Sequence, residues 1–166
     1  MSPIIFNADD ETATTTLGHA LADVLPPGTT VALCGTLGAG KTRLVQAIAE
    51  GLGVNRRDVV SPTFVLIQEY RGRRAIYHID AYRLRGDDEF QQLGPDEYFE
   101  SEGLVLIEWA DRVESSLPRE YVEIRLEVTG EKSRRFEIRA VGWRHEEVLR
   151  RLAQRWRGPS MEIPAV

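Results

Sequence analysis

The stretch Gly35-Thr36-Leu37-Gly38-Ala39-Gly40-Lys41-Thr42 fits the pattern G-x-x-x-x-G-K-[ST]. In this pattern the glycines let backbone N–H groups surround an anion, the lysine reaches the β- and γ-phosphates of a nucleotide, and the hydroxyl binds Mg²⁺. An apolar stretch at 30–34 runs into the loop, and residues 43–49 leave it with the apolar spacing of a helix. Strand, glycine-rich loop and helix in this order predict a phosphate-binding loop in an α/β domain.

The composition is that of a globular domain. Of the 166 residues, 42% are hydrophobic and 28% are charged. No run approaches the roughly 18 apolar residues of a membrane span, and no basic segment precedes an apolar core at the N-terminus. We therefore expect a cytoplasmic protein without membrane contact. The single cysteine, Cys34, excludes an internal disulfide and a cysteine-based metal cluster, and we expect it in the core.

The charge is unevenly distributed along the chain. The net charge of −5 argues against a protein whose whole surface binds nucleic acid. Residues 131–157 nevertheless hold nine Lys/Arg and four Asp/Glu. This region is either an Arg-rich solvated helix face or a contact for a polyanion, and we favour the solvated face.

Apolar patterning around the loop predicts a mixed sheet. Residues 64–70 and 74–80 are typical of an antiparallel hairpin, because a short turn separates them. The aliphatic run within 103–109 is typical of a parallel strand covered on both faces. Further strands are expected at 3–6, 121–128 and 134–141, and helices at 13–25, 87–93 and 143–156. The sequence thus predicts one P-loop NTPase-like α/β domain over residues 1–157, with a mixed parallel and antiparallel sheet flanked by helices, and a flexible tail at 158–166.

Two acidic residues are candidates for the metal and for the attacking water that a P-loop site uses. Glu108 follows the aliphatic run, at the end of a predicted central strand, and we assign it with Thr42 to Mg²⁺. Asp80 ends a more polar strand and is a candidate for positioning water or the hydration shell of the metal. The alternative for Asp80 is a cap in the turn 80–82.

Other polar residues admit two interpretations each. Thr63, in Ser61-Pro62-Thr63, is either a switch residue that senses the γ-phosphate or binds the attacking water, or part of a plain loop. His78 shares a strand face with Asp80 and is more often a structural residue than a base. Arg83 could approach the phosphates, although a surface salt bridge is the ordinary role.

The preference for adenine over guanine is indicated by the missing GTPase motifs. The sequence contains no D-x-x-G motif, and the nearest match to N-K-x-D is Asn55-Arg56-Arg57-Asp58, which has the wrong second residue and comes too soon after the loop. A GTPase is therefore disfavoured, and we expect ATP.

Four segments, in this order and spacing, resemble the bacterial TsaE family, formerly YjeE. They are the loop 35–42, Ser61-Pro62-Thr63-Phe64, His78-Ile79-Asp80-Ala81-Tyr82-Arg83-Leu84 and Leu106-Ile107-Glu108-Trp109. The resemblance covers about residues 8–142 and implies a small P-loop ATPase that uses ATP and Mg²⁺. Family members act with TsaD and TsaB in threonylcarbamoylation of tRNA, so tRNA would be reached through that complex.

The resemblance also implies roles for single residues. Leu37, Gly38, Ala39, Gly40, Lys41 and Thr42, with Gly35 before them, would bind the phosphates, and Thr42 and Glu108 would hold Mg²⁺. Lys41, Asp80, Glu108 and Thr63 would act in hydrolysis. Adenine contacts would come from Glu11 and Thr12 at the start of the first helix and from Arg134 in the late hairpin.

Two other functions remain open from the sequence. A small-molecule kinase would need an acceptor pocket with a base, for which Asp80 and His78 are candidates. A nucleotide-dependent binding module would use ATP to control association with a partner, and its hydrolysis would be incidental.

Overall fold

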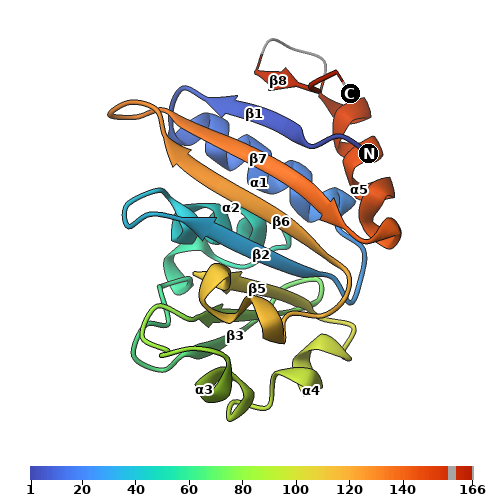
Figure 1. Cartoon of the computed structure of the whole chain (residues 1–166). Helices are drawn as coiled ribbons and strands as arrows, with labels where there is room; N and C mark the ends of the chain where they lie inside the picture. Colours follow the sequence, from blue (N-terminus) through green and yellow to red (C-terminus); the bar gives the residue numbers. More distant parts are fainter. Residues whose placement is uncertain (157–159, 166) are drawn as a thin grey trace.

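A mixed β-sheet forms the centre of the protein in its computed structural model, which describes residues 1–156 and 160–165 (Figure 1). Within these residues the sheet has eight strands in the order β3-β4-β5-β2-β6-β7-β1-β8. The strands are β1 Ile4–Ala8, β2 Thr30–Gly35, β3 Ile67–Arg71, β4 Ala75–Asp80, β5 Leu104–Glu108, β6 Tyr121–Val128, β7 Arg134–Val141 and β8 Met161–Glu162. The predicted fold class, a single α/β domain with a mixed sheet flanked by helices, is confirmed.

The four central strands, β4, β5, β2 and β6, run parallel to one another, and the outer strands pair antiparallel. Their register aligns Asp80 of β4 with Glu108 of β5, and Glu108 with Leu33 of β2. Because parallel strands end at the same edge of a sheet, the two acidic residues lie beside the loop that follows β2.

Helices cover both faces of this sheet. The larger core lies under α1 (Glu11–Val24), α2 (Lys41–Gly51) and α5 (Glu146–Arg155). The smaller core lies under α3 (Asp87–Gln91), α4 (Pro95–Phe99) and the 3₁₀ segment Ala110–Ser116. Two shorter 3₁₀ turns are Arg56–Asp58 and Trp143–His145. None of the helices in the described part of the chain is both long and apolar enough to span a membrane.

Strand β5 confirms the prediction of a strand covered on both faces, because all of its residues are buried. Leu104 and Leu106 belong to the larger core, whereas Val105 and Ile107 belong to the smaller one. This alternation follows from the two-residue period of side chains along a strand.

Two segments differ from the sequence prediction. The first hairpin strand begins at Ile67 and not at Phe64, because residues 64–66 form a turn in which the Leu66 N–H donates to the Pro62 carbonyl at 2.6 Å. Met161–Glu162, within the segment predicted as a loose tail, forms β8 and pairs with β1. Residues 157–159 and 166 lie outside the described residues, so the predicted domain boundary at 157 stays a prediction.

Helices α1 and α2 pack closely at Gly18, in the middle of α1, against Ala47 in the second half of α2. A Cβ atom at Gly18 would lie 2.3 Å from the Ala47 Cβ and 2.8 Å from the Ala47 carbonyl carbon. Only a residue without a side chain lets the two backbones approach this far.

We expect Gly18→Ala to lower the free energy of unfolding by about 1–3 kcal/mol, because overpacking at Ala47 outweighs the better helix propensity of alanine. Urea denaturation followed by circular dichroism measures this change. Thr16→Ala on the exposed side of α1 is the control, with an expected change within about 0.5 kcal/mol. A Gly18→Ala protein as stable as the parent would contradict this account of the packing.

Candidate functional site

The glycine-rich loop joins β2 to α2 at the carboxyl edge of the parallel strands. Gly38 and Gly40 have φ angles of 78° and 104°, a left-handed region that glycine adopts without strain. No atom lies within 4 Å of a Cβ built on either glycine. The backbone conformation, and not a lack of space for a side chain, therefore favours glycine at these two positions. The N-terminus of α2 begins at Lys41 directly after this turn, which makes its free N–H groups available to an anion.

Lys41 is held beneath the loop. Its Nζ donates to the carbonyl oxygens of Gly35 at 2.6 Å and Thr36 at 2.9 Å, and lies 3.9 Å from the ring centroid of Trp109. Burial lowers the pKa of Lys41, while the carboxylates of Glu108, Asp111 and Asp80 act to raise it. The site therefore combines a largely buried ammonium with several nearby carboxylates.

Glu108 is the acidic residue nearest to the P-loop threonine. The Thr42 hydroxyl donates to Glu108 Oε1 at 2.7 Å, and His78 Nε2 lies 2.8 Å from the same oxygen. Glu108 is 3% exposed and His78 is fully buried. A hydroxyl and a carboxylate at this separation are oxygen ligands of the kind that Mg²⁺ prefers. Among the described residues no group of three or more His, Cys, Asp or Glu forms a metal cluster, so phosphate and water oxygens would complete such a site.

Asp80 connects the end of β4 to the predicted switch segment. Its Oδ2 accepts hydrogen bonds from the hydroxyls of Ser61 at 2.8 Å and Thr63 at 3.0 Å. Its Oδ1 accepts from the Tyr82 N–H at 2.9 Å, which is the turn contact considered from the sequence. Asp80 is therefore a turn residue that also binds the 61–63 segment, and it is 2% exposed. Ser61 was missed as its partner, because a serine in a loop carries no distinct signal.

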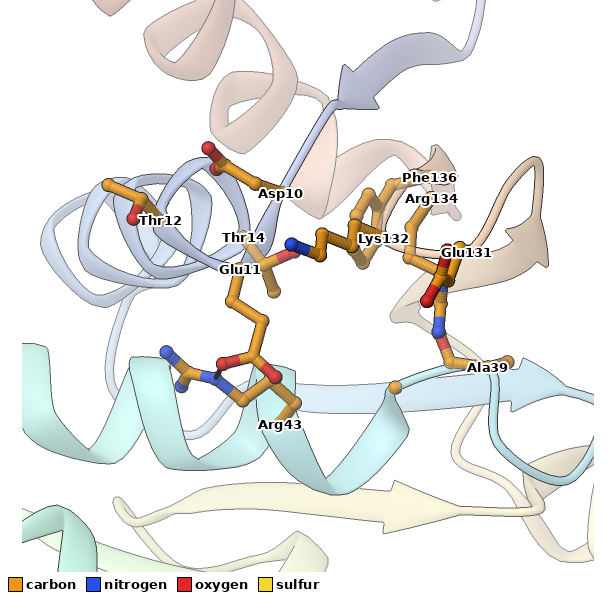
Figure 2. Close-up of a pocket in the computed structure, with 11 residues that line it drawn as sticks. Asp10, Glu11, Thr12, Thr14, Ala39, Arg43, Glu131, Lys132, Arg134 and Phe136 are labelled. Carbon is orange, nitrogen blue, oxygen red and sulfur yellow. Dashed lines mark hydrogen bonds and ion pairs between the residues drawn. The ribbon is translucent and has the colours of Figure 1, made fainter.

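Two adjacent cavities lie at the loop and share Gly40 and Arg43 in their walls. One, of about 380 Å³, is lined by Leu37, Gly38, Gly40, Lys41, Thr42, Arg43, Ser61, Thr63, Asp80, Tyr82, Glu108 and Trp109. The other, of about 450 Å³, is lined by Asp10, Glu11, Thr12, Thr14, Ala39, Gly40, Arg43, Glu131, Lys132, Arg134 and Phe136 (Figure 2). The first holds the predicted metal and hydrolysis residues and, of the predicted phosphate residues, Leu37, Gly38, Gly40, Lys41 and Thr42. The second holds the predicted adenine residues together with Ala39, whereas Gly35 lines neither cavity.

The second cavity lies between the start of α1 and the β6–β7 hairpin. Figure 2 shows Glu11 and Thr12 coming from α1 and Arg134 from β7, so the structure brings these three predicted residues together. Because Glu11 and Thr12 lie far from Arg134 in the sequence, no motif contains all three, and the sequence alone did not show that they meet. Lys132 and Asp10, which the sequence did not single out, line the same cavity.

Arg134 has a further role that its sequence position did not indicate. Its guanidinium donates to the carbonyl oxygens of Ala39 at 3.0 Å and Gly38 at 3.3 Å in the loop. It also donates to Ser133 at 2.8 Å and Gly130 at 3.1 Å in its own hairpin. The side chain thus joins the P-loop to the β6–β7 hairpin. Because these N–H groups already donate hydrogen bonds within the protein, fewer of them are available to donate to an adenine base.

Arg43 was missed by the sequence interpretation and lies in the wall between the cavities. One terminal nitrogen donates to the Thr15 hydroxyl. Nε lies 3.7 Å from a carboxylate oxygen of Glu11, and Figure 2 shows these two side chains next to each other. Nε and Nη1 are buried, and neither has a hydrogen-bond partner among the described residues. Burial lowers the pKa of this guanidinium. Nε is thus neutralised by the Glu11 carboxylate, whereas Nη1 is a buried donor without a hydrogen-bond partner among the described residues.

Comparison with known proteins gives consistent results. The model of the family described as Threonylcarbamoyl adenosine biosynthesis protein TsaE matches residues 8–136. The chain is 43% identical over 129 residues to the tRNA threonylcarbamoyladenosine biosynthesis protein TsaE of Bacillus subtilis, covering 77% of this chain and 80% of that protein. It is 39% identical over 121 residues to the protein of that name from Treponema pallidum, covering 73% and 89%. A crystal structure of Bacillus subtilis YdiB superposes with a TM-score of 0.79 at 33% identity, covering 93% and 97%.

Arg134→Ala should loosen the P-loop, because carbonyl oxygens of Gly38 and Ala39 lose a charged donor, a contact worth about 1.5–3 kcal/mol. Faster amide hydrogen exchange at Ala39 and Gly40, measured by mass spectrometry, is the expected result. Arg135→Ala is the matched control, since the side chain of Arg135 makes, among the described residues, only ion pairs of 3.6–3.7 Å with Glu127 and Glu137. Equal exchange in the two variants would show that Arg134 does not hold the loop.

Proposed function

The chain belongs to the TsaE family, whose role is in tRNA threonylcarbamoyladenosine biosynthesis, and we propose that it serves that modification as a Mg²⁺-dependent ATPase acting with TsaD and TsaB. The observation that carries the proposal is the joint lining of one cavity by Lys41, the Thr42–Glu108 pair and the Thr63–Asp80 pair. Phosphoryl transfer needs a phosphate cradle, a metal site and a group that orients the nucleophile. Residues on α2, β5, β4 and the 61–63 segment correspond to these three functions.

The proposed mechanism divides the reaction among these residues. The N–H groups of residues 38–42 and the Lys41 ammonium bind the β- and γ-phosphates and stabilise the charge that develops there. Thr42 and Glu108 would hold Mg²⁺, which when bound would supply positive charge to offset the negative charge that develops in the reaction. The Asp80 carboxylate accepts from hydroxyls of the 61–63 segment, and this arrangement orients the attacking water at the γ-phosphate end of the cavity.

ATP is the nucleotide that the second cavity supports. The cavity lies next to the P-loop, between the start of α1 and the β6–β7 hairpin, and shares Gly40 and Arg43 with the cavity that Lys41 lines. The guanine-reading motif of GTPases is missing from the sequence. Glu11, Thr12 and Arg134 are the proposed adenine-side residues, with Arg43 at the junction to the phosphates.

A small-molecule kinase has less support from the geometry. Both oxygens of Asp80 already accept hydrogen bonds, from Ser61, Thr63 and the Tyr82 N–H. His78 is fully buried against Glu108, so it does not face an acceptor. The residues that could serve as a kinase base are thus engaged within the protein. ADP formation that required an added acceptor would favour the kinase instead.

The proposed surface for TsaD and TsaB is the exposed apolar pair Phe64 and Val65, which directly follows Thr63 of the first cavity. Phe64 and Val65 are 84% and 64% exposed directly after Thr63, and the Arg83 guanidinium lies 4.5 Å from the Phe64 ring centroid. Exposed apolar residues of this size are typical of interaction sites. We further propose that the protein acts in the cytoplasm and reaches tRNA only through the complex.

Lys41→Ala and Glu108→Gln should each lower the rate of ATP hydrolysis by about 10²–10³-fold, because each removes a charge that stabilises the transition state or the metal. Release of phosphate from ATP with excess Mg²⁺ measures the rate, and circular dichroism checks the fold. Glu123→Gln is the control, since Glu123 is nearly buried and pairs with Arg125 outside both cavities. Hydrolysis near the parent rate by a folded Lys41→Ala or Glu108→Gln protein would rule out the proposed site.

Adding TsaD and TsaB should raise the rate of ATP hydrolysis above that of the isolated protein. Phe64→Ser should weaken this stimulation while the basal rate stays unchanged, because Phe64 lies outside both cavities. Trp143→Ser, which removes an equally exposed aromatic residue elsewhere, is the matched control. Pull-down with ATP, with ADP and without nucleotide identifies the binding state. A rate unaffected by TsaD and TsaB, together with association that depends only on ATP binding, would favour the nucleotide-dependent binding module.

A further inference from the structure

A buried histidine connects the proposed metal ligand to the base of the 61–63 segment. His78 Nε2 lies 2.8 Å from Glu108 Oε1, and Nδ1 lies 3.2 Å from the Tyr70 hydroxyl. The Tyr70 hydroxyl also lies 3.1 Å from the Val60 carbonyl oxygen, and its single proton is shared between these two acceptors. Val60 directly precedes Ser61, so a series of polar contacts runs from the carboxylate through β4 and β3 to the loop.

The direction of the first hydrogen bond follows from its partners. A carboxylate oxygen only accepts, and therefore His78 Nε2 carries the proton that is donated to Glu108. The Thr42 hydroxyl donates to the same oxygen at 2.7 Å. Two donors from different elements, α2 and β4, thus fix the rotation of one carboxylate. Since His78 is fully buried and Glu108 is 3% exposed, water does not replace either donor easily.

A second connection reaches the same loop along β4. Asp80 lies two residues after His78 on this strand and accepts from the hydroxyls of Ser61 and Thr63. The loop is therefore anchored twice, at Val60 through Tyr70 and at Ser61 and Thr63 through Asp80. The imidazole is the group through which the Val60 anchor is connected to the Glu108 carboxylate.

We propose that His78 is a positioning residue: its Nε2–H holds Glu108 in the orientation that binds the metal, and its contact with Tyr70 keeps the 60–63 segment in place beside that carboxylate. The proposal rests on the proposed function in one respect, that Glu108 is a ligand of the divalent cation. Hydrogen-bonded partners of metal ligands commonly change metal affinity or activity by about 10–100-fold when removed.

The test replaces His78 with two amide side chains of different length, glutamine and asparagine. His78→Gln keeps an N–H near the Nε2 position, whereas the shorter side chain of His78→Asn cannot reach Glu108. Mn²⁺ binding to the full chain in the presence of ADP, measured by electron paramagnetic resonance, gives metal affinity without turnover. His78→Asn should weaken Mn²⁺ binding about 10–100-fold, and His78→Gln should restore most of that loss. ADP binding in the absence of metal should be unchanged in both variants, because the P-loop is intact.

Tyr70→Phe separates the two parts of the proposal. It removes the hydroxyl that reaches Val60 but keeps the Nε2 donor to Glu108, so Mn²⁺ affinity should stay near that of the parent protein. The turnover of ATP at saturating Mg²⁺ should fall, because the 60–63 segment loses one anchor. Unchanged turnover would overturn the proposed link to the loop.

Three results would overturn the role of His78 at the metal. They are equal loss of Mn²⁺ affinity in the Gln and Asn variants, a parallel loss of metal-free ADP binding, or an unchanged Mn²⁺ affinity in His78→Asn. If the parent protein binds Mn²⁺ with ADP but hydrolyses no ATP, the proposed function fails while the Gln–Asn comparison still decides the role of His78.

Discussion

The register of β4 on β5 is the constraint on which the functional site depends. It sets Asp80 opposite Glu108 at the ends of adjacent parallel strands, beside the loop that leaves β2. Two carboxylates with only 2% and 3% of their surface exposed repel each other and lose hydration, so each needs donors from the protein. Glu108 receives them from Thr42 and His78, and Asp80 from Ser61, Thr63 and the Tyr82 N–H. The hydrogen bonds that these two carboxylates accept therefore connect α2, β4 and the 61–63 segment to one another.

The sequence predicted the parts of this arrangement that follow from local pattern. The P-loop, the buried strand β5 and both hairpins carry periodicity or spacing that a single segment displays. The positions of Glu108 and Asp80 at strand ends follow from the same patterns, because the end of an apolar run marks the end of a strand. The resemblance to the TsaE family added the grouping of four distant motifs, and the family matched residues 8–136.

What the sequence could not provide are contacts set by tertiary packing. His78 looked structural on its own strand, and only the pairing of β4 with β5 brings its ring to Glu108. Arg134 was considered as an adenine contact, but its bonds to Gly38 and Ala39 join residues about 95 positions apart. Arg43 gave no signal, since an arginine after the P-loop reads as an exposed helix residue until α1 is packed over it. The turn at 64–66 was missed because Phe64 and Val65 are apolar and fit a strand pattern while remaining exposed.

The two cavities indicate the orientation that a nucleotide would take in the proposed site. Gly40 and Arg43 form their common wall, so a nucleotide that spans both would have its base between α1 and the β6–β7 hairpin and its terminal phosphate near Thr63 and Asp80. The base end is fixed to the P-loop through Arg134, whereas the terminal phosphate end borders the exposed apolar residues 64–65. If ATP binds as proposed, a change at its γ-phosphate would reach the Asp80–Thr63 contact, which directly precedes the exposed residues 64–65. In the proposed site, loss of that phosphate would therefore alter the surface offered to a partner more directly than it would alter the base-binding end.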